Sequence, residues 1–91
     1  MILVRRIVGQ SMLPTLRPGA LVLASRLKRP TPGAVVIARH GGREIIKRIE
    51  KMDDRGYFLL GDHPAASTDS RRYGWLAPGS LRAVVFGKIG R

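Results

Sequence analysis

Glycine and proline interrupt this chain so often that a long helix cannot form. The 91 residues include 11 Gly and 6 Pro, and both residue types weaken or end a helix in its interior. The segments between them are rich in Val, Ile and Leu, which are typical of β-strands. We therefore expect six strands, at Ile2–Val8, Ala20–Ser25, Ala34–Arg39, Arg43–Met52, Tyr57–Leu60 and Leu81–Ile89.

Two of the connections between these strands carry turn signals. His40-Gly41-Gly42 and Asp53-Asp54-Arg55-Gly56 each join two strand segments closely, and glycine supplies the positive φ that tight hairpins need. Short strands joined by hairpins indicate an all-β fold, namely a small antiparallel, barrel-like or coiled sheet. A chain of this length makes one domain, so residues 1–91 are expected to form a single unit.

The composition narrows the possible functions. Cysteine does not occur, which excludes a disulfide scaffold, a thiolate zinc site and a cysteine nucleophile. The formal charge is +11, from 17 Lys and Arg against 6 Asp and Glu. This excess indicates a polyanionic partner, an anionic membrane surface or an acidic substrate. Alternatively, arginine is simply the residue used on exposed faces.

The sequence has no segment long enough to cross a membrane. The apolar stretch Met1-Ile2-Leu3-Val4 is ended by Arg5-Arg6, whereas a transmembrane helix needs about 20 apolar residues. We expect a soluble, cytoplasmic chain that is at most peripheral at a membrane.

Ser11 is the first candidate for chemistry. It lies in the run Gly9-Gln10-Ser11-Met12-Leu13-Pro14-Thr15, where glycine allows a tight turn and proline restrains its exit. A serine hydroxyl in such a turn is accessible, but it needs a neighbouring base to become a nucleophile. Backbone N–H groups of the turn could stabilise an oxyanion, and Gly9, Gln10, Met12 and Pro14 would contact the substrate. A serine that only closes a turn is the structural alternative.

Lys47 is the candidate base. In an alternating strand, Ile45, Lys47 and Ile49 share one face, whereas Ile46, Arg48 and Glu50 share the other. Lys47 is therefore a charged residue on an apolar stripe, where burial lowers the pKa of an amine. A neutral lysine can accept the proton of a serine. The alternative is a lysine at a strand edge that extends its amine into water.

The two histidines offer other possibilities. Ser11, His63 and either Asp62 or Asp69 could form a Ser–His–Asp triad, although triads are defined by positions in space. His63 shares a loop with both acids, which favours a hydrogen-bonding role within that loop. His40 and His63 do not have the spacing of metal ligands, so we expect no metal site and no cofactor.

Three motifs occur in a fixed order along the chain: Gly-x-Ser-Met-x-Pro-Thr-Leu from Gly9, a Lys-Arg pair at Lys47, and Gly-Asp-x5-Ser-x-Asp-Ser-Arg from Gly61. In this order they resemble the type I signal peptidase family of serine endopeptidases. The resemblance extends from about Ile7 to Phe86. It implies the small β catalytic core of that family.

The resemblance also implies roles for particular residues. Ser11 would be the nucleophile and Lys47 the general base of a Ser–Lys dyad. Ser67 matches the serine that hydrogen-bonds the lysine and orients it. Asp69 and Arg71 match a buried ion pair that supports the site.

The chain departs from the family pattern in several places. From these residues we expect neither an N-terminal membrane anchor nor the large additional β domain, and Gly9 occupies a position where some members have a serine that stabilises the oxyanion. So small a core resembles one subgroup, the maturation proteases of nickel-type superoxide dismutase, which remove a short N-terminal pro-segment from a protein precursor. Nickel would then belong to the substrate.

Three other functions are alternatives to this one. One is a type I signal peptidase that cleaves secretory precursors, with peripheral membrane contact through Ile2–Arg6. Another is a repressor-type domain that cleaves itself, although no helix-turn-helix pattern or cleavage segment is evident. The third is a basic nucleic-acid-binding β-barrel. Such barrels stack bases on aromatic platforms, and the few aromatic residues here show no such spacing, so we expect no nucleic-acid partner.

Overall fold

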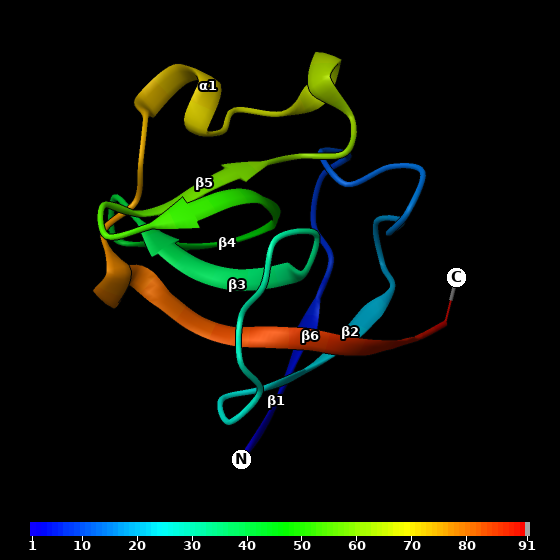
Figure 1. Cartoon of the computed structure of the whole chain (residues 1–91). Helices are drawn as coiled ribbons and strands as arrows, with labels where there is room; N and C mark the ends of the chain where they lie inside the picture. Colours follow the sequence, from blue (N-terminus) through cyan, green and yellow to red (C-terminus); the bar gives the residue numbers. More distant parts are fainter. Residues whose placement is uncertain (91) are drawn as a thin grey trace.

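The computed structural model describes residues 1–90 and contains one six-stranded sheet, in which each strand is antiparallel to its neighbours (Figure 1). The expected all-β fold is confirmed. The strands are β1 (Ile2–Arg6), β2 (Leu21–Ser25), β3 (Val35–His40), β4 (Arg43–Asp53), β5 (Gly56–Leu60) and β6 (Leu81–Ile89). Their order in the sheet is β1-β2-β6-β3-β4-β5, so β1 and β5 are the edges.

The order of the strands divides the sheet into two parts joined by its last strand. β1 and β2 form one antiparallel pair, and β3, β4 and β5 form a meander. β6 lies between them and pairs with β2 on one side and with β3 on the other. The sheet also coils, as shown by an ion pair between strands that are not neighbours: Nε of Arg5 in β1 lies 2.7 Å from Oε1 of Glu44 at the start of β4.

The turn between β3 and β4 shows why glycine is needed there. Gly41 and Gly42 have φ values of 60° and 78°, the left-handed region that other residues adopt at a cost. Two successive residues of this kind are typical of the tight hairpin turn whose twist matches that of the strands. The expected hairpin therefore forms, and it places β3 and β4 in register from Val35↔Arg48 to His40↔Arg43.

Both faces of the sheet are covered. On one face, a cluster formed by β3, β4, β5, β6 and Leu76 includes Val36, Ala38, Ile49, Leu59 and Val84. On the other face, the segment between β1 and β2 contributes Ile7, Met12 and Leu16, which pack with Ala20 and Val22. Ile45 packs against the first cluster, whereas Ile46 packs against the second. These contacts follow the alternation expected for β4.

The segment between β5 and β6 contains short helices that the sequence did not indicate. They are η1 (Pro64–Ala66), α1 (Ser70–Tyr73) and η2 (Pro78–Ser80). Figure 1 shows α1 in the connection above β5. The Asp69 side chain caps α1 by accepting a hydrogen bond from the backbone N–H of Arg71, a stabilising arrangement at a helix start. Within residues 1–90, no helix is long and apolar enough to span a membrane.

Candidate active site

Ser11 lies in the turn-rich connection between β1 and β2, where part of its surface is exposed. Gly9 has a φ of 79°, and the N–H of Leu13 donates to the carbonyl of Gln10 over 3.2 Å. The next residue, Met12, is 2% exposed and packs in the second core cluster. Burial of Met12 thus anchors the turn while Ser11 stays at the surface.

His63 holds the backbone on both sides of Ser11. Its ring atom Nδ1 lies 3.2 Å from the carbonyl oxygen of Gln10, and a carbonyl can only accept, so Nδ1 carries the proton. The backbone N–H of His63 donates to the carbonyl of Ser11 over 2.8 Å. The two peptide groups that flank Ser11 are therefore held by one residue, which is a hydrogen-bonding role for His63.

Lys47 is buried at the centre of β4, opposite Val36 of β3. It is 6% exposed. Burial lowers the pKa of its amine below the ordinary value, and this effect outweighs the attraction of the Asp69 carboxylate. The amine is therefore closer to neutral at physiological pH than that of an exposed lysine.

Ser11 and Lys47 line the same two adjoining cavities. The smaller has a volume of about 250 Å³ and is bounded by residues 5–8 and residues 43–47. The larger has a volume of about 510 Å³ and extends toward Ala66, Thr68 and Tyr73. Val8, Arg43 and Ile45 line both. The cavities together form a groove, called here the β1–β4 groove, with the serine and the lysine in its wall.

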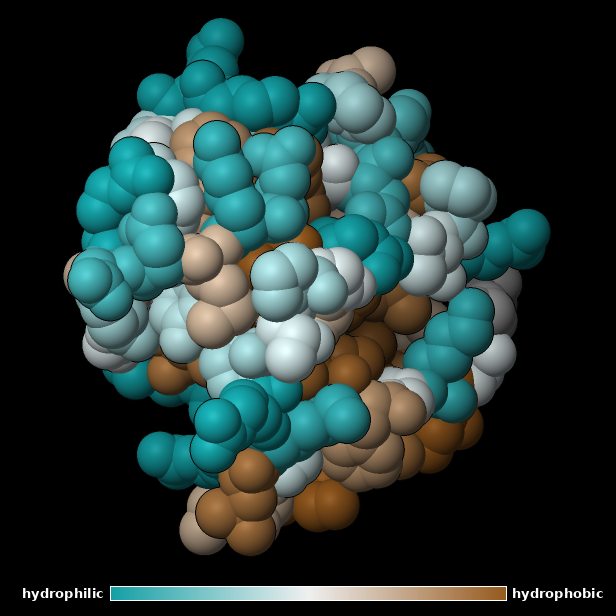
Figure 2. All heavy atoms as spheres, in the orientation of Figure 1, coloured by the Kyte–Doolittle hydropathy of each residue, from teal (hydrophilic) through white to brown (hydrophobic). Residues whose placement is uncertain are grey.

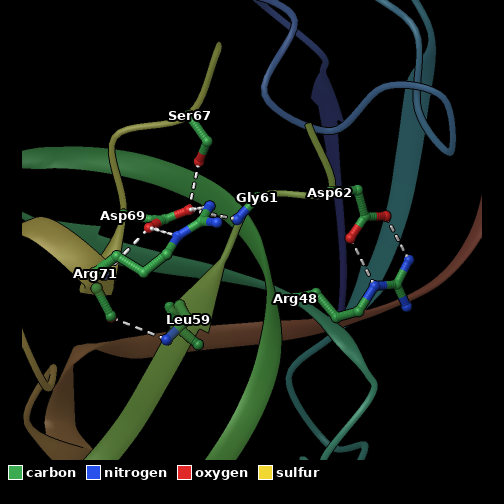
Figure 3. Close-up of polar contacts among 8 residues, drawn as sticks. Arg48, Leu59, Gly61, Asp62, Ser67, Asp69 and Arg71 are labelled. Atoms are coloured by element: carbon green, nitrogen blue, oxygen red, sulfur yellow. Dashed lines mark hydrogen bonds and ion pairs between the residues drawn. The ribbon is translucent and has the colours of Figure 1, made fainter. Parts of the chain in front are cut away.

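Asp69 is the centre of a polar cluster beside this groove (Figure 3). Its carboxylate is 1% exposed. It accepts hydrogen bonds from the hydroxyl of Ser67 at 2.7 Å, from the backbone N–H of Gly61 at 2.8 Å and from Nε of Arg71 at 2.9 Å. Arg71 adds a second bond through Nη2, so the ion pair is bidentate.

The environment of Asp69 keeps it charged. Burial alone would raise the pKa of this carboxyl, but the hydrogen bonds from Arg71, Ser67 and Gly61 outweigh burial and hold the pKa far below its usual range. The side chain of Arg71 remains 41% exposed. The ion pair expected from the resemblance is thus present, with a buried acid and a partly exposed base.

The resemblance gives Ser67 the role of orienting the amine of Lys47 through a hydrogen bond. In the structure its hydroxyl donates to Asp69. Within residues 1–90 no hydrogen bond joins Ser67 to Lys47. Orientation of the lysine by this hydroxyl therefore stays a prediction.

Gly61 explains how the Ser11 turn and the Ser67 loop come together. A Cβ atom at this position would lie 2.2 Å from Oγ of Ser67 and 2.7 Å from the carbonyl oxygen of Ser11. Both distances are far below van der Waals contact. Only glycine fits at this crossing, and it brings the candidate nucleophile, the end of β5 and the Asp69 cluster into contact.

A second ion pair ties the Ser11 segment to β4, and sequence reasoning gave it no role. Nε and Nη2 of Arg48 bind the two oxygens of Asp62 at 2.9 and 2.7 Å, as Figure 3 shows. The hydroxyl of Thr15 donates to the same carboxylate at 2.6 Å. Both residues of this ion pair belong to the motifs, since Arg48 follows Lys47 in one motif and Asp62 follows Gly61 in another.

A family model, Peptidase S24-like, matches residues 2–72. The chain belongs to the Peptidase S24-like family. The matched region contains Ser11, Lys47, Ser67, Asp69 and Arg71, and it ends before β6. Membership supports a serine-peptidase type of function. A comparison with curated proteins found no match.

Within residues 1–90, no hydrogen bond joins His63 to Asp62 or Asp69, the two acids considered for a triad. Both carboxylates that could complete a triad are bound by arginines, Asp62 by Arg48 and Asp69 by Arg71. The side chain of His63 faces the carbonyl of Gln10. Among residues 1–90, no group of three or more His, Cys, Asp or Glu residues is placed to hold a metal ion.

The four residues expected to contact substrate in this S24-like chain differ in position. Gly9 and Gln10 line the larger cavity, and Met12 lines the smaller one although it belongs to the core. Pro14 is exposed and lines neither cavity. Substrate contact at these positions stays a prediction. Met12 also has a packing role, because it is buried in the second core cluster.

Proposed function

We propose that this chain is a serine endopeptidase in which Ser11 is the nucleophile and Lys47 the general base. The observation that carries the proposal is the shared groove, since the serine and a buried lysine of lowered pKa line the same two cavities. Perturbed titratable groups in a cleft are typical of functional sites. The Asp69 cluster fits the same proposal by holding the adjacent loop.

The proposed reaction has two stages. Neutral Lys47 accepts the proton of the Ser11 hydroxyl as Oγ attacks the scissile carbonyl, and the backbone N–H of Ser11 stabilises the oxyanion. The lysine then gives its proton to the leaving amine, which frees the new N-terminus and leaves an acyl-enzyme. A water molecule, deprotonated by the same amine, releases the acyl group and restores Ser11.

The groove also favours an extended polypeptide as substrate. β5 pairs with β4 only from Arg48 onward, so residues 43–47 have β3 on one side and, within residues 1–90, no strand on the other. An unpaired strand edge can bind an extended peptide by β-augmentation. We infer that the substrate lies along residues 43–47, next to the segment that leads from β1 to Ser11.

The dyad is tested by substitution. Ser11→Ala and Lys47→Ala should each abolish cleavage, and the double variant should be no worse than either, because the two residues act as one unit. Cleavage assayed beside thermal melts separates lost chemistry from lost folding. More than a few per cent of activity in folded Lys47→Ala would rule out lysine as the base and would point to His63.

The substrate is proposed to be a protein precursor cleaved once near its N-terminus. The resemblance to the maturation proteases of nickel-type superoxide dismutase supports that precursor as the first substrate to test. Incubation with the purified precursor, followed by sequencing of the new N-terminus, should give one product with wild type and none with Ser11→Ala. An uncleaved precursor would exclude this substrate, and a secretory precursor is then the next candidate.

A further inference from the structure

Acidic residues are confined to one part of the chain. All six Asp and Glu residues lie between positions 44 and 69, whereas residues 1–43 contain eight Lys and Arg and no acid. Four of the six acids are bound by arginine side chains: Glu44, Asp53, Asp62 and Asp69. Figure 2 shows hydrophilic side chains over much of one face of the molecule. The excess positive charge is therefore not neutralised within the fold.

The β1–β4 groove contains much of this uncompensated charge. Arg5, Arg6, Arg43 and Lys47 line the smaller cavity, and Arg43 and Lys47 also line the larger one. Glu44 is the only carboxylate residue among those lining the two cavities, and both of its oxygens are bound by Arg5, at 2.7 and 3.2 Å. The groove thus presents cations to its ligand without a free acid.

Arg43 is the cation best placed to bind a ligand. It is exposed, it lines both cavities, and its guanidinium has no hydrogen bond or ion pair with any of residues 1–90. By contrast, Arg5 is bound to Glu44 and Arg6 donates to the carbonyl of Gly19. The five N–H donors of a guanidinium can bind a carboxylate through two parallel hydrogen bonds.

We infer that the groove selects acidic polypeptide segments, and that Arg43 binds an Asp or Glu side chain of the substrate. The inference rests on the proposed function for the location of the scissile bond. Arg43 and Lys47 lie on the same face of β4 and four residues apart, which is about 13 Å along a strand. The acidic side chain therefore lies within about four residues of the scissile bond.

This separation is chemically consistent with the proposed base. A carboxylate close to Lys47 would raise the pKa of the amine and keep it protonated. The Coulomb attraction falls with distance, so at about 13 Å it is about one third of its value at about 4 Å, and the bound carboxylate is also neutralised by Arg43. Arg43 can therefore bind an acidic side chain without disabling the base.

Peptide binding tests the inference separately from catalysis. Two fluorescein-labelled twelve-residue peptides of alternating Thr and Ala, one with two central Glu and one with two central Gln, are titrated into the Ser11→Ala protein. The Glu peptide should bind roughly tenfold to a hundredfold more tightly, the range expected for hydrogen bonds between charged partners. Adding Arg43→Glu should abolish this difference, and Arg43→Lys should keep part of it.

A matched variant controls for net charge. Arg26→Glu changes the charge by the same amount at an exposed position that lines neither cavity, so the Glu peptide should keep its advantage. Equal binding of the two peptides, or an equal loss in the Arg26 and Arg43 variants, would overturn the inference. Failure of the proposed function gives a different result, namely preferential binding to Arg43 with no Ser11-dependent cleavage by the wild-type protein.

Discussion

Lys47 is the residue whose environment most directly predicts a measurable property. Burial lowers the pKa of its amine, and the proposed base must be neutral. Activity should therefore increase with pH as the amine loses its proton, with a midpoint below the ordinary lysine value of about 10.4. The pH dependence of kcat/KM, measured where thermal melts show that the protein stays folded, checks this prediction.

The same shift has a consequence for stability. The unfolded chain binds more protons than the folded one between the lowered pKa of Lys47 and its ordinary value, so the contribution of this residue to the free energy of unfolding increases with pH in that window.

For the pH dependence of the rate, a maximum near pH 5 would contradict a lysine base. A profile with the midpoint of an unperturbed lysine would instead contradict the lowered pKa of Lys47.

Asp69 and Ser67 lie in one cluster but should respond differently to substitution. Asp69→Ala leaves Arg71, Ser67 and the Gly61 N–H without their shared acceptor. Each lost hydrogen bond to this charged group is worth about 1.5–3 kcal/mol, and the buried N–H of Gly61 is left unsatisfied, so the total loss is a large part of the stability of a small domain. Ser67→Ala removes one hydrogen bond to a charged group, worth about 1.5–3 kcal/mol.

The two variants are compared by thermal melts and by turnover of the folded protein. Asp69→Ala should melt much earlier than Ser67→Ala. If Ser67 also orients Lys47, its variant should lose roughly tenfold to a thousandfold in kcat at temperatures where it is folded. Melting points and activities equal to those of wild type in both variants would show that the loop is only a connector.

At the scale of elements, the end of β5 is the junction of the site. Gly61→Ala places a Cβ against Oγ of Ser67 and the carbonyl of Ser11, so either the Ser11 turn or the Ser67 loop must move. A displacement of about 1 Å can cost a hundredfold in rate. We expect Gly61→Ala to lose at least that much activity and also to melt earlier, as measured by kinetics and by circular dichroism.

Gly79→Ala is the matched control, because a Cβ there has no neighbour within 4 Å and no positive φ is required. It should keep wild-type activity and melting temperature. Equal behaviour of the Gly61 and Gly79 variants would mean that the close approach at Gly61 does not position the nucleophile.

The elements also show which features the sequence could predict. All six strands were located to within two residues, because branched aliphatic runs between glycine and proline encode them locally. The largest difference is at β1, which ends at Arg6 rather than Val8. The sequence does not predict α1 because four residues carry no apolar periodicity, and its capping residue Asp69 is held by the N–H of Gly61, directly after β5.

The site was predictable only in part for a similar reason. Motif order identified Ser11, Lys47 and the Asp69–Arg71 pair as candidates. The hydrogen bonds of His63 to Gln10 and of Thr15 to Asp62 join residues 53 and 47 positions apart. Such contacts follow from the order of strands in the sheet, which local patterns do not encode.

At the scale of the whole molecule, the position of β6 makes the fold depend on its last strand. Among the strands of residues 1–90, β6 alone pairs with both the β1–β2 pair and the meander, and it contributes buried Ala83 and Val84. A chain ending at residue 80 should therefore lose cooperative unfolding and activity. Thermal melts followed by circular dichroism check this, and a cooperative melt with retained cleavage would contradict it.

The placement of β6 also bears on the order in which the parts of the sheet can assemble during synthesis. Ser11 is carried by the segment between β1 and β2, whereas Lys47 lies in the meander, and β6, which joins these two parts of the sheet, is synthesised after both. Chains are made from the N-terminus at about 5–20 residues per second and fold as units. The sheet that carries Ser11 and Lys47 can therefore close only after β6 has been made, although the contacts of the Ser11 segment with His63 and Asp62 can form before it.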